Sequence, residues 1–156
     1  MVEIIDETGR FRRREALRLA LSDLGDELGA ADRELTVVLV GDDAIAALNR
    51  DHRGVEGPTD VLSYPLHEPD DVGMPQVRAL GDVVVSLDTA KRQAREQGHA
   101  PWREVLLLAA HGLLHLLGFD HPDAAAWRPF GAAQQRVLAL ADARARSAAS
   151  AVGPLP

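Results

Sequence analysis

Cysteine is absent from this chain of 156 residues, and its absence limits both the covalent and the metal chemistry of the protein. Without cysteine the chain forms no disulfide bond and no zinc or iron–sulfur site with thiolate ligands. Any zinc ion must therefore be held by histidine and carboxylate side chains. We also expect no partner that is joined to the chain through a disulfide.

Long apolar runs are missing as well. The longest run, Val105 to Ala110, is far shorter than the roughly 18 residues that a membrane-spanning helix needs. Residues 1–7 are acidic and lack a long apolar core, so they do not have the pattern of a signal peptide. We therefore expect a cytoplasmic protein with no membrane partner.

The chain also lacks an excess of basic residues. Its 17 Lys and Arg stand against 24 Asp and Glu, which gives a formal net charge of −7. This balance argues against a wholly basic nucleic-acid binder but leaves room for a local basic patch. Two candidate patches are the arginines of residues 10–18 and the group Lys91, Arg92 and Arg95. Each is either a phosphate-binding surface or an ordinary solvated helix face.

The apolar pattern predicts a single α+β domain over residues 1–146, followed by a frayed tail over residues 147–156. We expect a mixed β-sheet of about four strands, packed with about five helices. The predicted strands are Val2–Ile5, Leu35–Val40, Val61–Tyr64 and Leu80–Ser86. The predicted helices are Arg10–Leu28, Asp42–Asn49, Thr89–Gln97, a helix with Pro101 in its first turn that is apolar over Val105–Leu117, and residues 124 to about 145, with Asp42 and Asp88 as N-caps.

The most informative segment is an apolar helix that ends in three histidines. His111 and His115 are four residues apart, so they lie on the same face of the helix. Gly118 can end the helix with a positive φ and turn the chain, which would bring His121 back toward the other two imidazoles. Three histidine ligands leave the fourth position of a zinc ion open to water, as in catalytic sites. Zinc lowers the pKa of bound water toward about 7. The competing interpretations are buried core histidines and a structural zinc ion.

The histidine spacing matches the long metalloprotease motif H-E-x-x-H-x-x-G-x-x-H, but Gly112 stands in the place of the glutamate. That glutamate is the general base of the proteases. The sequence therefore argues against peptide hydrolysis by the usual route.

The same segment resembles the signature of the YbeY endoribonuclease family. The run H-G-L-L-H-L-L-G-F-D-H over residues 111–121 carries the resemblance. L-N-R-D-H-R-G over residues 48–54 and P-T-D-V-L-S-Y-P over residues 58–65 resemble a second family motif, and L-G-D-V-V-V-S over residues 80–86 resembles the strand before the metal helix. The family usually has Phe at the position of Tyr64 and often Tyr at Phe119. Where its last helix often carries Met and Glu, this chain has Phe130 and Gln134.

The resemblance implies a metal-dependent endoribonuclease that prefers single strands. Its implied roles are maturation of ribosomal RNA, at the 3′ end of the small-subunit rRNA, and ribosome quality control. The implied ligands of one zinc ion are His111, His115 and His121. Arg53 falls on a functionally important arginine of the second motif, where it would stabilise the charge that builds up on the phosphate. Implied partners are ribosomal RNA and, on the ribosome, ribosomal proteins or an assembly GTPase.

Several residues are weaker candidates, for which an ordinary structural role is the main alternative. They are Asp60, Ser63 and Asp82, together with Asp120 as a hydrogen-bond partner of a histidine ligand. The remaining histidines, His52, His67 and His99, lack ligand spacing and are expected at the surface. Low aromatic content, 4%, predicts little base stacking and weak sequence reading.

Two other functions remain open from the sequence. One is a zinc hydrolase like the metalloproteases but without their glutamate base. The other is a ribosome assembly factor that is not an enzyme and uses zinc only to stabilise its fold.

Overall fold

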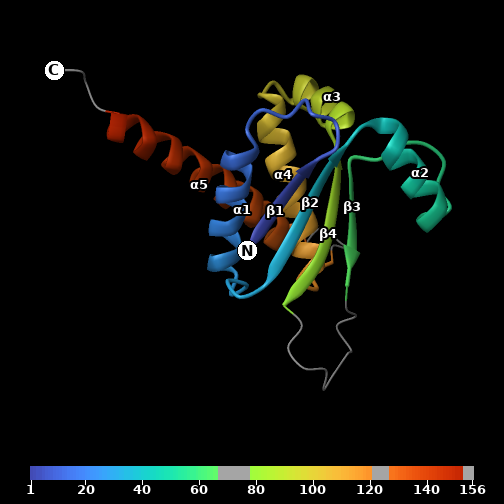
Figure 1. The fold of residues 1–156 in the computed structure, drawn as a ribbon, viewed down its shortest axis with the longest axis horizontal. Helices are drawn as coiled ribbons and strands as arrows, with labels where there is room; N and C mark the ends of the chain where they lie inside the picture. Colours follow the sequence, from blue (N-terminus) through green and yellow to red (C-terminus); the bar gives the residue numbers. More distant parts are fainter. Residues whose placement is uncertain (67–77, 121–126, 153–156) are drawn as a thin grey trace.

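The computed structural model describes residues 1–66, 78–120 and 127–152 (Figure 1). Within these residues four strands form one sheet: β1 (Val2–Asp6), β2 (Glu34–Val40), β3 (Val61–Pro65) and β4 (Ala79–Ser86). The helices are α1 (Arg14–Glu27), α2 (Asp42–Arg53), α3 (Leu87–Gln97), α4 (Pro101–Leu116) and α5 (Arg128–Val152). This arrangement confirms the predicted α+β class, with a mixed sheet of four strands and five helices.

The sheet has the strand order β1-β2-β4-β3. Strands β1, β2 and β4 run parallel, as the helical connections between them require. Strand β3 is antiparallel to β4 and lies at an edge of the sheet, with Ser63 opposite Val83 and Tyr64 opposite Asp82. Because side chains alternate along a strand, Ser63 and Tyr64 point to opposite faces of the sheet.

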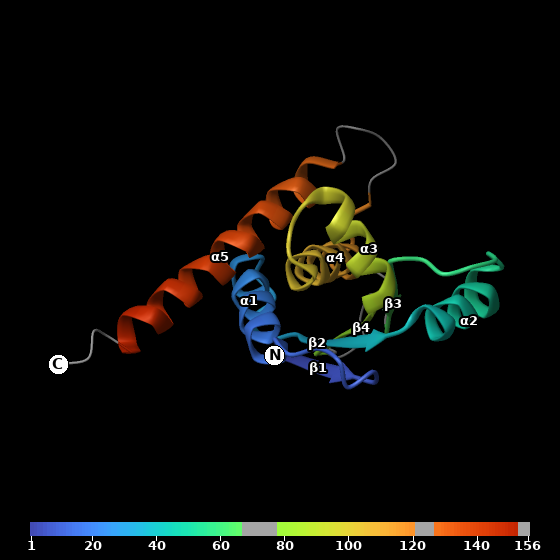
Figure 2. The same ribbon diagram turned by 90° about the horizontal axis from the view of Figure 1, so that it is seen from above.

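The two faces of the sheet are covered unequally. Helices α1, α3, α4 and α5 lie on one side, where they bury the main core (Figure 2). Helix α4 contributes Leu106 and Leu113, which pack in one cluster with Val83 and Val85 of β4. On the other side, α2 forms a small separate cluster in which Ile45, Leu62 and Val84 are buried. Edge strand β3 therefore separates α2 from α4.

Several helix ends differ from the sequence prediction. Helix α1 begins at Arg14 rather than Arg10. The carboxylate of Asp6 accepts hydrogen bonds from the backbone N–H groups of Thr8 and Phe11, which holds the preceding residues in a loop. Neither predicted N-cap was correct. Gly41 caps α2, and Ser86 caps α3 by accepting a hydrogen bond from the N–H of Thr89.

The last helix extends further than predicted. Helix α5 runs to Val152, so residues 147–152 of the predicted tail are helical. Contacts with α1 and α4 continue along α5 as far as Asp142 and Arg144, and the C-terminal end of the helix projects from the body of the protein (Figures 1 and 2). Among the described residues, no helix is long and apolar enough to cross a membrane.

Candidate metal site and its surroundings

Helix α4 places two of the three predicted metal ligands together. His111 and His115 lie one turn apart, as their spacing predicts, and their Nε2 atoms are 3.1 Å apart. Their ring centroids are 4.8 Å apart and their planes meet at 64°. Both side chains are half-buried at the end of the apolar helix.

This separation fits two ligands of one metal ion. Zinc–nitrogen bonds of about 2.0–2.1 Å at a tetrahedral angle place two ligand nitrogens about 3.3 Å apart. The observed 3.1 Å is close to this value, and both atoms are the Nε2 type that commonly binds metals. The donor set on α4 is therefore compatible with zinc.

The end of α4 shows the chain reversal that the sequence predicts. Gly118 has φ of 97°, its N–H bonds to the carbonyl of His115, and the N–H of Phe119 bonds to the carbonyl of Leu114. These two bonds form a Schellman motif, in which glycine adopts the left-handed conformation without a Cβ clash. The third predicted ligand, His121, lies outside the described residues. Within the described ranges no group of three or more possible metal ligands occurs, so the complete triad remains a prediction.

Two aromatic side chains, one on α5 and one just before it, surround the histidine pair, and no sequence pattern marked either as functional. The centroid of the fully buried Phe130 ring is 4.7 Å from that of His111 and 5.0 Å from that of His115. Trp127 lies 5.6 Å from His111 and is 45% exposed. The imidazoles therefore pack against a buried apolar ring, with an indole beside them.

Gly112 is required by close packing between α4 and the sheet. A Cβ at this position would lie 2.5 Å from Cγ1 of Val83 and 3.2 Å from Oγ of Ser63. Oγ of Ser63 also donates a hydrogen bond of 3.3 Å to the carbonyl of Gly112. A glutamate, as in the metalloproteases, would thus clash with β4 and would point toward the sheet. The structure gives a packing reason for the residue that breaks the protease motif.

Arg53 ends α2 on the other side of β3. Its side chain is exposed, and Nη1 donates a hydrogen bond of 3.3 Å to Oδ1 of Asn49. The positive charge of Arg53 acts on Tyr64, but burial of the phenol has the larger effect and raises the pKa of Tyr64 above its ordinary value. The described contacts do not bring Arg53 to His111 or His115, so its predicted catalytic role is not visible in the geometry of the chain alone.

Of the weaker candidates, Asp60 and Ser63 make structural contacts, and Asp82 and Asp120 are exposed. Asp60 accepts hydrogen bonds from the N–H of Val61, at 2.8 Å, and from Nε2 of Gln93, at 3.2 Å, so it fixes the start of β3 against α3. Asp82 is exposed on β4, and Asp120 is exposed just after the turn that ends α4.

The expectation of a surface position was wrong for one histidine. His99 is half-buried, and its Nε2 lies 2.5 Å from Oε2 of the buried Glu104. His52 is exposed and packs edge-on against Tyr64, at 5.3 Å between ring centroids. His67 lies outside the described residues.

Comparison with known proteins agrees with the motifs. A family model described as Endoribonuclease YbeY matches residues 5–141. The Endoribonuclease YbeY of Deinococcus radiodurans is 55% identical over 71% of this chain and 70% of its own length. That of Thermus thermophilus is 50% identical over 80% of this chain and 88% of its own. The solution structure of TM1509 from Thermotoga maritima is 30% identical, with a TM-score of 0.68 over 94% of this chain and 93% of that one. These matches confirm the resemblance.

Proposed function

This chain belongs to the YbeY endoribonuclease family, and from that premise we propose that it is a hydrolase that cleaves single-stranded ribosomal RNA. The proposed roles are maturation of the 3′ end of the small-subunit rRNA and ribosome quality control. The observation that carries the proposal is the pair of Nε2 atoms 3.1 Å apart at the end of α4. This pair lies within the segment whose sequence resembles the family signature.

We propose one zinc ion, held by His111, His115 and His121. The first two present nitrogens at a separation that suits a single ion, and Gly118, three residues before His121, ends the helix with a positive φ. When bound, zinc supplies a Lewis acid to a phosphodiester and lowers the pKa of water. Phe130 packs against the imidazoles of both His111 and His115. This packing restricts the ring orientations and keeps the two Nε2 atoms directed toward the same point.

Arg53 is the proposed phosphate-binding side chain. Negative charge on the non-bridging oxygens grows during cleavage, and a guanidinium can bind two of them at once. Arg53 is exposed, and within residues 1–66, 78–120 and 127–152 its one side-chain hydrogen bond, to Asn49, leaves further donors for a ligand. An RNA strand that crosses the edge at β3 would contact both α2 and the end of α4.

The first test combines metal analysis with RNA cleavage. We expect purified protein to contain about one zinc per chain, and His111→Ala to lose both the metal and cleavage. Arg53→Ala should keep the metal and lose about a hundredfold in kcat, as removal of one charge-stabilising donor does elsewhere. Arg50→Ala removes an exposed arginine from the same helix and serves as the matched control, with near-normal cleavage expected. Full activity of Arg53→Ala would show that Arg53 does not contribute to cleavage.

The products distinguish two forms of attack. Cyclic phosphate ends would show that the RNA 2′-hydroxyl attacks phosphorus, and linear ends from the first turnover would show attack by water. Both outcomes keep the endoribonuclease assignment and identify the nucleophile.

Two alternatives make different predictions. A metalloprotease would cleave peptides in a manner that depends on His115 and not on Arg53, but the packing at Gly112 leaves no room for the usual glutamate. An assembly factor with structural zinc would support ribosome maturation normally with Arg53→Ala. Binding to ribosomal proteins or to an assembly GTPase is a further proposal from the family, and it is tested by co-purification with ribosomal subunits.

A further inference from the structure

A pocket of about 430 Å³ opens at the opposite end of α4 from the histidines. Its wall contains residues 10–13, which precede α1, together with Leu87 and Lys91 of α3 and the first turns of α4. Along α4, Trp102 in the pocket and His111 are nine residues apart, or about 14 Å at 1.5 Å per residue. The pocket is therefore distinct from the candidate metal site. Its volume falls within the range of about 300–1,000 Å³ that is usual for ligand pockets.

Residues from both basic groups identified in the sequence line this pocket. Arg12 and Arg13 come from the first group and Lys91 from the second, and all three are exposed. In the described part of the chain, none of these three side chains has a carboxylate within ion-pair distance. The chain has a net charge of −7, so this concentration of unpaired positive charge is a local exception.

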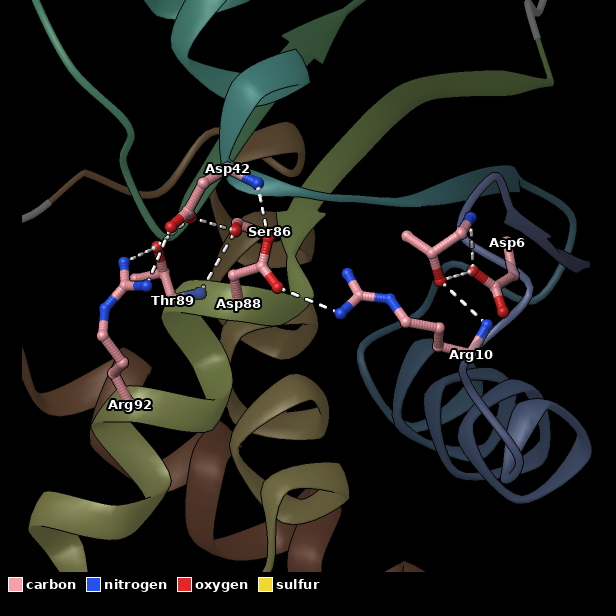
Figure 3. Close-up of polar contacts among 8 residues, drawn as sticks. Asp6, Arg10, Asp42, Ser86, Asp88, Thr89 and Arg92 are labelled. Carbon is pink, nitrogen blue, oxygen red and sulfur yellow. Dashed lines mark hydrogen bonds and ion pairs between the residues drawn. The ribbon is translucent and has the colours of Figure 1, made fainter.

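The acidic groups near the pocket already have other partners. Asp88 binds Nη1 of Arg10 at 3.1 Å and accepts a hydrogen bond of 2.8 Å from the N–H of Asp42 (Figure 3). Asp42 in turn forms an ion pair with Arg92 at 2.8 Å. On α4, the buried Glu104 is paired with His99. These pairs leave Arg12, Arg13 and Lys91 as the uncompensated charges at the pocket.

The rest of the wall is apolar and aromatic. Phe11 and Trp102 are half-buried, and Val105 is buried. The guanidinium carbon of Arg13 lies 4.8 Å from the centroid of the Trp102 ring. A guanidinium held over an indole in this way offers a flat surface to a second planar group, and its N–H groups remain available to an anion.

We propose that this pocket binds one nucleotide of a single-stranded RNA. The base packs among Phe11, Trp102 and the Arg13 plane, and the adjoining phosphates are held by Arg12 and Lys91. A ligand that is both planar and anionic satisfies the apolar wall and the charges together. The proposal rests on the proposed function, because it gives the same RNA a second anchor at the other end of α4.

The test measures binding of a fluorescent single-stranded RNA of about 16 nucleotides. A chelator is present, so that cleavage does not interfere. The test variant is Arg12→Gln with Lys91→Gln, and the matched control is Arg33→Gln with Arg146→Gln, which removes two exposed positive charges away from the pocket. At 0.1 M salt we expect the test variant to bind about 25-fold more weakly than the control, the factor that two lost phosphate contacts give between 0.1 M and 1 M salt. The slope of log Kd against log salt should fall by about 1.4, for two lost phosphate contacts on a single strand.

Three results would contradict the proposal that this pocket binds a nucleotide of single-stranded RNA. They are equal binding by the test and control variants, equal competition by polyglutamate at the same charge concentration, and equal competition by free uridine monophosphate at the same nucleotide concentration. Crosslinking with 4-thiouridine RNA gives the location, and we expect adducts on peptides that contain Phe11 or Trp102. Adducts confined to the histidine end of α4 would also contradict the proposal.

Equal binding by test and control variants, alongside normal cleavage by the wild type, would exclude the pocket as an RNA-binding site and leave the proposed function intact. Absence of RNA cleavage by the zinc-loaded wild type would contradict the function itself.

Discussion

At the scale of single residues, the packing around Tyr64 on one face of β3 and around Gly112 on the other decides how a substitution changes stability. The hydroxyl oxygen of Tyr64 is buried and has no hydrogen-bond partner among the described residues. Gly112 packs so closely that a single methyl group would overlap Val83. The Tyr64 hydroxyl can therefore be removed without loss of a described hydrogen bond, whereas a Cβ cannot be added at position 112 without a clash. Both make predictions that are independent of catalysis.

Replacing Tyr64 by Phe should leave stability unchanged or raise it by up to about 1–2 kcal/mol. A buried hydroxyl without a partner has lost its hydrogen bonds to water and gained none in return. Urea unfolding of the wild type and Tyr64→Phe measures the difference. The control Tyr64→Ala should lose stability, because it removes the ring that packs with the α2 cluster. A loss of more than about 1 kcal/mol in Tyr64→Phe would show that the hydroxyl has a partner.

Replacing Gly112 by Ala should destabilise the fold by about 1–3 kcal/mol, since the added Cβ would overlap a buried, β-branched neighbour. Gly25→Ala is the matched control. It lies within α1, and a Cβ there meets nothing within 4 Å, so better helix propensity should stabilise the protein by about 0.5–1 kcal/mol. Thermal melting of both variants provides the comparison. Equal behaviour of the two variants would contradict the close approach of α4 to β4.

The sequence predicted the local part of the site better than its assembly. The spacing of His111 and His115 and the glycine at position 118 are determined within one helix and its end, and both predictions are confirmed. The packing of Phe130 under the imidazoles depends on how α5 docks against α4, which no local pattern encodes. The proposed catalytic role of Arg53 is equally hard to predict from sequence, because α2 and α4 lie on opposite faces of the sheet.

At the scale of whole elements, long-range contacts changed the boundaries that local signals predicted. Asp42 and Asp88 were predicted as N-caps because of their residue type, but the carboxylate of Asp88 accepts the N–H of Asp42 and binds Arg10. That of Asp42 accepts hydrogen bonds from Ser86 and Thr89 (Figure 3). The two acidic residues thus join α2, α3 and the loop before α1, a role that depends on the fold and not on sequence neighbours. Helix ends were predicted less accurately than helix identities for this reason.

The ion pair that docks α5 on α1 predicts how the stability of the fold depends on pH. Arg144 binds Asp23 through Nε at 2.5 Å and Nη2 at 2.8 Å. Its hydrogen bonds hold the pKa of Asp23 below its ordinary value of 3.8. The carboxylate is therefore more easily ionised in the folded chain than in the unfolded chain. The pair stabilises the fold above about pH 4, and the contribution is lost as pH falls below that value.

We therefore expect Asp23→Asn to lose about 0.5–1 kcal/mol at neutral pH, a value reduced by the partial exposure of both side chains. The difference from the wild type should shrink as the pH falls below 3.8 and also as salt is added. Asp32→Asn, which replaces an exposed carboxylate beyond the end of α1, is the control and should change stability little at neutral pH. Urea unfolding between pH 2 and pH 7 measures both variants. A pH-independent difference would show that Asp23 acts through packing and not through its charge.

At the scale of the whole molecule, the core and the candidate metal site are separable. The main cluster packs the sheet against four helices, and Leu17, Val37 and Leu106 within it are fully buried. His111 and His115 lie at the margin of this cluster, half-buried, at the end of a helix whose other buried residues already pack against β4 and α5. Hydrophobic burial on this scale supports folding of the chain without a metal.

Metal removal should consequently abolish cleavage while leaving the fold intact. A catalytic ion at 100 times its Kd stabilises the folded state by about 2.7 kcal/mol, which corresponds to about 5–11 °C in Tm for a chain of this size. A structural zinc would contribute about 10–16 kcal/mol, and its loss would unfold the protein. Circular dichroism melting with and without a chelator, together with an RNA cleavage assay, tests this distinction. We expect unchanged helical signal at 25 °C, a modest fall in Tm, and activity that returns when zinc is added back. Loss of the helical signal at 25 °C would instead support the assembly factor with structural zinc, since the core would then depend on the ion that the histidines bind.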